Sequence, residues 1–198
     1  MMYFLAGPFV VPLNAKAGSS SLSLAIIQRW HPTVYQSIVD AHYPAGKTMH
    51  DVRWHSLCPY TTTPTVPVVL GVRDPVERFR SGVAYFDLDV DAAIDSLLNG
   101  TEIARERRTL VLSKDVHFSQ QHKCGHGSTH LFRFPDDLEP MCQLLDLTTI
   151  PTDNVTPRPK PTLTSAQRAA VEQHYAMDMA LYADITQPNT IAEFDAEP

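Results

Sequence analysis

A short segment with a lysine, a glycine and three serines lies between an apolar run and a segment with the apolar spacing of an amphipathic helix. The run Phe9–Leu13 predicts a strand, and apolar side chains then recur every four residues from Leu22, as in a helix. A loop between a strand and a helix offers backbone N–H groups and the positive end of the helix dipole to an anion. We therefore predict an anion-binding loop in which the lysine adds a full charge, made of Lys16, Ala17, Gly18, Ser19, Ser20 and Ser21. It differs from the nucleoside triphosphate loop because the lysine precedes the glycine.

A second candidate follows the clearest strand of the sequence, the β-branched run 66–72. This run leads into Arg73, and Asp74, Pro75 and Glu77 then form a typical helix start, with an N-cap, a first-turn proline and an acidic third position. In the predicted helix Ser81 lies about 10 Å along the axis from the cap, at a rise of about 1.5 Å per residue. An arginine and a serine at this spacing can bind a phosphate from two sides.

The two segments resemble the donor-binding motifs of sulfotransferases that use 3′-phosphoadenosine 5′-phosphosulfate (PAPS). In that family a lysine precedes a glycine and hydroxyl residues in the 5′-phosphosulfate loop, and a strand-end arginine precedes a serine by eight residues in the 3′-phosphate motif. The resemblance implies that Lys16 meets the charge developing on the bridging and 5′-phosphate oxygens. It also implies that residues 17–21 hold the 5′-phosphate and that Arg73 and Ser81 hold the 3′-phosphate, with no metal required.

A looser resemblance links the segment His117–Cys124 to the His-Trp-x-Pro-Gln segment of Golgi carbohydrate sulfotransferases. Phe118 replaces the tryptophan, and no proline is present. The later run 131–134 and a final helix with Tyr175 and Asp178 look like the C-terminal half of that family. The resemblance therefore covers most of the chain, although only the first two motifs are specific.

The acceptor hydroxyl needs a base, and a histidine suits this role because its ordinary pKa of about 6.5 lies near neutral pH. His50 and His55 stand upstream of the second motif, where the uronosyl 2-O-sulfotransferases that the chain partly resembles keep theirs. We expect His50 first, with His55 and His117 as further candidates and Asp51 as a carboxylate alternative. The acceptor expected is a carbohydrate or a small molecule.

Other interpretations of the same residues stay open. The serine-rich loop can be an ordinary helix cap, and Arg73 can pair with Glu77 as a structural ion pair. Several histidines and Cys124 near residues 117–130 raise zinc binding as a minor alternative, although their spacing fits no standard site. Among functions, a kinase-like nucleotide enzyme with Mg²⁺ is one alternative, and a non-catalytic nucleotide-binding module is the other.

The pattern of elements predicts a single α/β domain over residues 1–198, with three layers and a mainly parallel central sheet related to the P-loop fold. We expect a short N-terminal extension and loops over 43–65 and 151–161, and the segment 105–114 is ambiguous between helix and loop. Strands are predicted at 9–13, 66–72 and 130–134, and helices at 22–30, 35–39, 75–86, 91–98, 138–145 and 164–185. His31 and Pro32 should end the first helix, and Thr164 and Gln167 form a capping pair at the start of the last one. The buried stripe of the helix 75–86 is predicted to be Val76, Phe79, Val83 and Phe86.

Composition limits the possible partners and the compartment. The formal net charge of the 198 residues is −6, which argues against a broad surface for nucleic acid. Three cysteines are too few for a disulfide framework and favour a reducing compartment. The apolar N-terminus lacks a basic leader and is shorter than the roughly 20 residues of a spanning helix, so we expect a cytoplasmic protein without a membrane partner.

Overall fold

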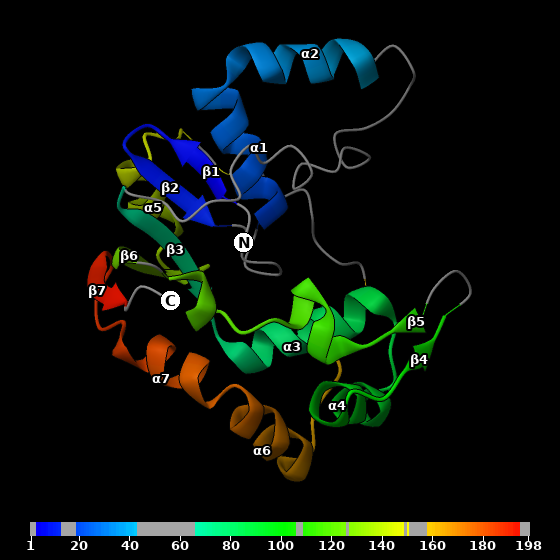
Figure 1. The fold of residues 1–198 in the computed structure, drawn as a ribbon. Coiled ribbons are helices and arrows are strands. Elements are labelled where there is room, and N and C mark those ends of the chain that lie inside the picture. Colours follow the sequence, from blue (N-terminus) through cyan, green and yellow to red (C-terminus); the bar gives the residue numbers. More distant parts are fainter. Residues whose placement is uncertain are drawn as a thin grey trace.

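A five-stranded sheet forms the centre of the computed structural model of the chain (Figure 1). The structure describes residues 3–12, 19–42, 66–105, 109–125, 127–148, 150 and 158–194. Along the sheet the strands follow one another as β1 (Tyr3–Ala6), β2 (Phe9–Pro12), β3 (Val68–Arg73), β6 (Gly127–Phe134) and β7 (Thr190–Phe194). The predicted α/β class is confirmed, since helices cover both faces of this sheet.

The sheet is mixed, with parallel strands at its centre and antiparallel strands at both edges. β2, β3 and β6 are parallel, whereas β1 pairs antiparallel with β2 and β7 antiparallel with β6. The predicted N-terminal extension is therefore wrong, because residues 3–6 of it form β1, in a hairpin whose turn contains Gly7 at a φ of 61°. Strand β7 was not predicted either. Both edge strands are short, so their sequence signal is weak beside that of β3.

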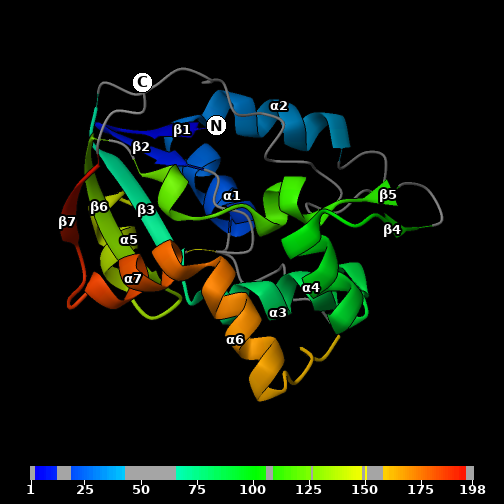
Figure 2. The same ribbon diagram turned by 60° about the horizontal axis from the view of Figure 1, so that its bottom comes forward.

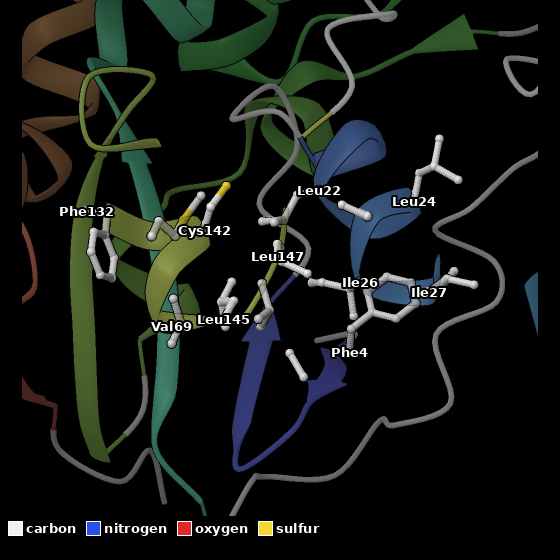
Figure 3. Close-up of a cluster of buried hydrophobic side chains, with 14 residues drawn as sticks. Phe4, Leu22, Leu24, Ile26, Ile27, Val69, Phe132, Cys142, Leu145 and Leu147 are labelled. Carbon is white, nitrogen blue, oxygen red and sulfur yellow. The ribbon is translucent and has the colours of Figure 1, made fainter. Parts of the chain in front are cut away.

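One face of the sheet is covered by α1 (Ser19–Trp30) and α5 (Leu138–Leu144), both close to their predicted positions. Figure 3 shows the buried cluster between them, to which Val69 and Phe132 contribute from the sheet and Ile26 from α1. The first helix ends at Trp30, directly before His31 and Pro32 as predicted, and α2 (Pro32–His42) follows it. The face opposite α1 carries α7 (Ala176–Asp184), packed through Leu181 and Ile185.

A second group of helices lies beyond the carboxyl end of β3 (Figure 2). It comprises α3 (Pro75–Phe86), α4 (Val90–Asn99) and α6 (Ser165–His174). The stripe predicted on α3 is confirmed, because Val76, Phe79, Val83 and Phe86 are all buried. These side chains form a cluster with Leu97 of α4 and Val171 of α6 that is separate from the clusters on the sheet.

Short elements connect α4 to β6. Strands β4 (Ile103–Ala104) and β5 (Thr109–Leu110) form a small antiparallel sheet, and three 3₁₀ turns follow at Leu112–Lys114, Val116–Phe118 and His122–Cys124. The described part of 105–114 is thus a strand and a 3₁₀ turn and contains no α-helix. The predicted loop 43–65 lies outside the described residues, as does most of the predicted loop 151–161.

The long C-terminal helix predicted over 164–185 is two helices, α6 and α7, which meet at Tyr175. The predicted capping pair is confirmed, since Thr164 accepts from the backbone of Gln167 and the Gln167 side chain returns to the cap. The break needs no proline or glycine. Val171 and Tyr175 pack into the α3 cluster while Leu181 and Ile185 pack on the sheet, so the two halves follow different surfaces. Within the described ranges, no helix is long and apolar enough to cross a membrane.

Candidate functional site

Arg73 is the last residue of β3, where the strand turns directly into α3. Asp74 caps the helix by accepting a hydrogen bond from the Glu77 N–H at 2.8 Å, and Pro75 occupies the first helical position, as predicted. Residues two apart in a strand share a face. Val69 packs in the cluster under α1, and the Gly71 backbone approaches Met141 of α5. Arg73 therefore leaves the sheet on the face that α1 and α5 cover.

The N-terminus of α1 lies at the same edge of the sheet. At the other end of α1, Trp30 contacts the β1–β2 turn so closely that a Cβ on Gly7 would lie 2.8 Å from its ring. That turn is at the amino end of β2, and β2 runs parallel to β3, so α1 begins at the carboxyl edge where Arg73 stands. Its first turn holds no acidic residue, and the N-terminus of a helix carries the positive end of the helix dipole, which attracts anions.

In the sequence, the predicted phosphate loop connects β2 to α1. Residues Lys16, Ala17 and Gly18 lie outside the described residues, between the end of β2 and the start of α1. Ser19, Ser20 and Ser21 are the first three residues of α1, and Ser21 is half-buried. The two ends of the loop and Arg73 thus share one edge and one face of the sheet.

Two further residues of the second motif are buried in α3. Ser81 is 9% exposed and Arg78 is 1% exposed. The Arg78 guanidinium donates to the carbonyl oxygen of Ser119 and lies over the Tyr175 ring, 5.4 Å from its centroid. Arg78 therefore has structural partners, whereas Ser81 remains a candidate ligand.

Burial sets the electrostatics of Arg73. Removal of the guanidinium from water lowers its pKa, Glu77 and Asp74 oppose this effect, and Arg78 adds to it. A bound anion offsets such a desolvation cost, because its negative charge stabilises the guanidinium in place of the lost water.

Glu77 forms ion pairs with Arg80 and, at 2.9 Å, with Lys160. Burial raises the Glu77 pKa, but these two cations outweigh that effect and the net pKa is lowered.

The segment with the third resemblance lies directly against Arg73. The Gln121 side chain, fully buried, donates from Nε2 to the Arg73 carbonyl oxygen at 2.7 Å and accepts from the Arg73 N–H at 3.0 Å. Asp178 of α7, also fully buried, accepts from the backbone N–H groups of Gln121 at 2.7 Å and His122 at 2.9 Å. Segments 48 and 57 residues apart in the sequence are thus joined at the end of β3.

Of the three candidate bases, only His117 belongs to the described residues. His50 and His55 lie outside the described residues, as does Asp51. His117 is half-buried; its Nδ1 lies 2.7 Å from Asp115 Oδ1, and its ring contacts Phe86 and stacks on Tyr85. Both aromatic residues belong to the last turn of α3, so His117 sits near the far end of that helix from Arg73.

Neither Gln121 nor Asp178 has a role that the sequence predicts. The signal available was the final glutamine of the third motif, and nothing in the sequence shows that its amide meets a strand end. In the part of the chain that the structure describes, no group of three or more histidine, cysteine, aspartate or glutamate side chains is placed to hold a metal. His122 has Asp178 as its partner at 2.7 Å.

Fold and site together define an α/β protein with a half-buried arginine and a helix N-terminus at one edge of a mixed sheet whose central strands are parallel. No known family model, curated protein or solved structure matches the chain.

Proposed function

We propose that this chain is a sulfotransferase that transfers a sulfuryl group from PAPS to a hydroxyl of a carbohydrate or small-molecule acceptor. The observation that carries the proposal is the common edge and face of Arg73 and the α1 N-terminus. Ligands of parallel α/β sheets bind at the carboxyl ends of the strands, and both Arg73 and the start of α1 lie at that edge. The proposal includes a P-loop-related sulfotransferase fold.

The residues fit a donor with phosphates at both ends of its ribose. Arg73 and Ser81 supply a half-buried cation and a buried hydroxyl for the 3′-phosphate. The first turn of α1, with the loop that precedes it, supplies N–H groups and Lys16 for the 5′-phosphosulfate. Adenosine monophosphate lacks the 3′-phosphate and leaves the first of these sites empty.

In the proposed reaction the acceptor oxygen forms a bond to sulfur while the bond between sulfur and the bridging 5′-phosphate oxygen breaks. The nucleotide 3′-phosphoadenosine 5′-phosphate (PAP) leaves with the electron pair, and the hydroxyl proton passes to a base. Lys16 stabilises the charge on the leaving oxygen, since catalysis of such loose transfers depends on position and charge. His50 is the first candidate base, followed by His55 and His117.

Calorimetric titration of the purified chain with PAP, AMP and ATP plus Mg²⁺ tests the donor site. We expect PAP to bind at least about tenfold more tightly than AMP, since a hydrogen bond to a charged group is worth roughly 1.5–3 kcal/mol. Arg73→Ala should abolish the preference, and Arg168→Ala, an exposed arginine of α6, should retain it. Equal affinity for PAP and AMP would contradict the proposal, and Mg²⁺-dependent ATP turnover would favour a kinase.

Turnover is tested with ³⁵S-labelled PAPS and a panel of sugars and small alcohols. Transfer that is lost in Lys16→Ala, with an unchanged melting temperature, would support the assigned role of this lysine. PAP binding without transfer to any acceptor would instead support a non-catalytic nucleotide-binding module.

A further inference from the structure

The side-chain amide of Gln121 occupies the position that a neighbouring strand would take beside the last residue of β3. It presents one donor and one acceptor to the N–H and carbonyl oxygen of Arg73, at 3.0 and 2.7 Å. A primary amide matches the hydrogen-bonding groups of a peptide unit, so both backbone groups of Arg73 are satisfied by one side chain. The end of the strand is thereby fixed where β3 leaves the sheet.

The amide is itself fixed by α7. Asp178 accepts from the two successive N–H groups of Gln121 and His122, and its Oδ1 also lies 2.7 Å from His122 Nδ1. Gln121 and Asp178 are both fully buried, where hydrogen bonds are little weakened by water. A rigid connection therefore runs from α7 through Gln121 to the backbone of Arg73.

On the other side of Arg73 the chain is held by the helix cap. Asp74 Oδ1 accepts from the Glu77 N–H, and the Asp74 carbonyl accepts from the Arg78 N–H at 2.9 Å. Arg73 thus lies between a capped helix start and the Gln121 amide. A long side chain on a fixed backbone loses less freedom when it binds a ligand, and the binding is correspondingly tighter.

We propose that Gln121 is a positioning residue for 3′-phosphate recognition, which it supports by holding the backbone of Arg73, and that Asp178 holds Gln121 in place. This inference rests on the proposed function, because it assigns Arg73 to the 3′-phosphate. Gln121 does not touch the donor in this assignment. Its effect falls on the discrimination between PAP and AMP, and the binding of the shared 5′-phosphate and adenosine is unaffected.

The test compares the PAP and AMP affinities of the full chain and its Gln121→Met variant. Methionine keeps the length of the side chain and removes both hydrogen bonds. We expect the preference for PAP to fall about tenfold or more while AMP affinity changes less than about twofold. The matched control is Gln120→Met, since Gln120 is half-buried, adjacent, and donates at 3.2 Å to His174 instead of a strand end.

A double-mutant cycle separates positioning from a general loss of structure. If Gln121 acts through Arg73, Gln121→Met should reduce the affinity for PAP itself no further in an Arg73→Ala background. Independent, additive losses would overturn the inference. Hydrogen exchange adds a readout without nucleotide: the Arg73 amide should exchange faster in Gln121→Met than in Gln120→Met, and equal exchange would overturn it.

The PAP preferences of the wild type and of Gln121→Met separate the proposed function from the positioning role. If the wild-type chain shows no preference for PAP, the proposed function fails. If the wild type prefers PAP and Gln121→Met keeps the full preference, only the positioning role fails. Should Gln121→Met not fold, the same titrations on Gln121→Asn decide, because the shorter amide cannot reach both backbone groups of Arg73; retained preference there would overturn the role.

Discussion

Arg78 of α3 donates a hydrogen bond to the carbonyl oxygen of Ser119, 41 residues further along the chain. The guanidinium is 1% exposed and lies over the Tyr175 ring, while the Tyr175 hydroxyl donates to the Phe118 carbonyl at 2.7 Å. These contacts tie the segment before Gln121 to α3 and to the junction of α6 and α7. The candidate site therefore depends on buried polar contacts that lie outside the two donor motifs.

Arg78→Ala should destabilise the fold. It removes a buried cation from its partners, leaves the Ser119 carbonyl without this donor and opens a cavity beside Tyr175, so we expect the free energy of unfolding to fall by about 2–4 kcal/mol. Urea unfolding measures the change. The exposed Arg168, paired with Glu172 at 3.3 Å, is the control, and Arg168→Ala should change stability by less than about 0.5 kcal/mol. Equal effects of the two substitutions would show that Arg78 is not part of a buried network.

Two buried serines on neighbouring helices should respond differently to alanine. Ser81→Ala is expected to weaken PAP binding about tenfold and to leave AMP binding and the melting temperature nearly unchanged, since a charged hydrogen bond is lost only in the complex. Ser96 of α4 instead accepts from the Leu112 N–H at 3.0 Å. Ser96→Ala should lower the free energy of unfolding by about 1–2 kcal/mol without altering the PAP preference. The reverse pattern would remove Ser81 from the donor site.

Substitution by alanine should have different effects at two glycines, because the space around them differs. A Cβ on Gly82 of α3 would lie 2.7 Å from the Phe118 ring, which also packs against Phe79. Gly82→Ala should therefore cost about 1–3 kcal/mol despite the higher helix propensity of alanine. A Cβ on Gly71 would lie 3.6 Å from Met141 Sδ, an ordinary contact, so Gly71→Ala should be tolerated. Thermal unfolding distinguishes them, and a stabilised Gly82→Ala variant would contradict the packing found around Phe118.

Stability should decrease in alkali through Tyr175. Burial, opposed by Arg78 and aided by Asp178, raises the pKa of its hydroxyl to about 12. Between the ordinary pKa of about 10 and this value the folded chain keeps a proton that the unfolded chain releases, so stability is full below about pH 10 and is lost as pH rises toward 12. Urea unfolding of the wild type and Tyr175→Phe should give a steeper fall for the wild type. Parallel pH profiles would contradict the burial of this hydroxyl.

Local signals predicted much of the scaffold. The N-cap Asp74, the first-turn Pro75, the β-branched run of β3 and the Thr164–Gln167 capping pair all act within a few residues, and each is confirmed. Longer-range features were missed. Strand β7 forms only because β6 offers it an edge, and the C-terminal helix breaks at Tyr175 because its two halves pack on different surfaces.

Sequence alone determined the α/β class, the start of α3 and the order of the candidate motifs, since these follow from periodicity and capping between near neighbours in the chain. Only the tertiary structure decided that Arg73 and the start of α1 share an edge and a face of the sheet. It alone also brought Gln121 and Asp178 to the end of β3. Such contacts join residues about fifty positions apart, and they form only when parallel strands and packed helices bring distant segments together.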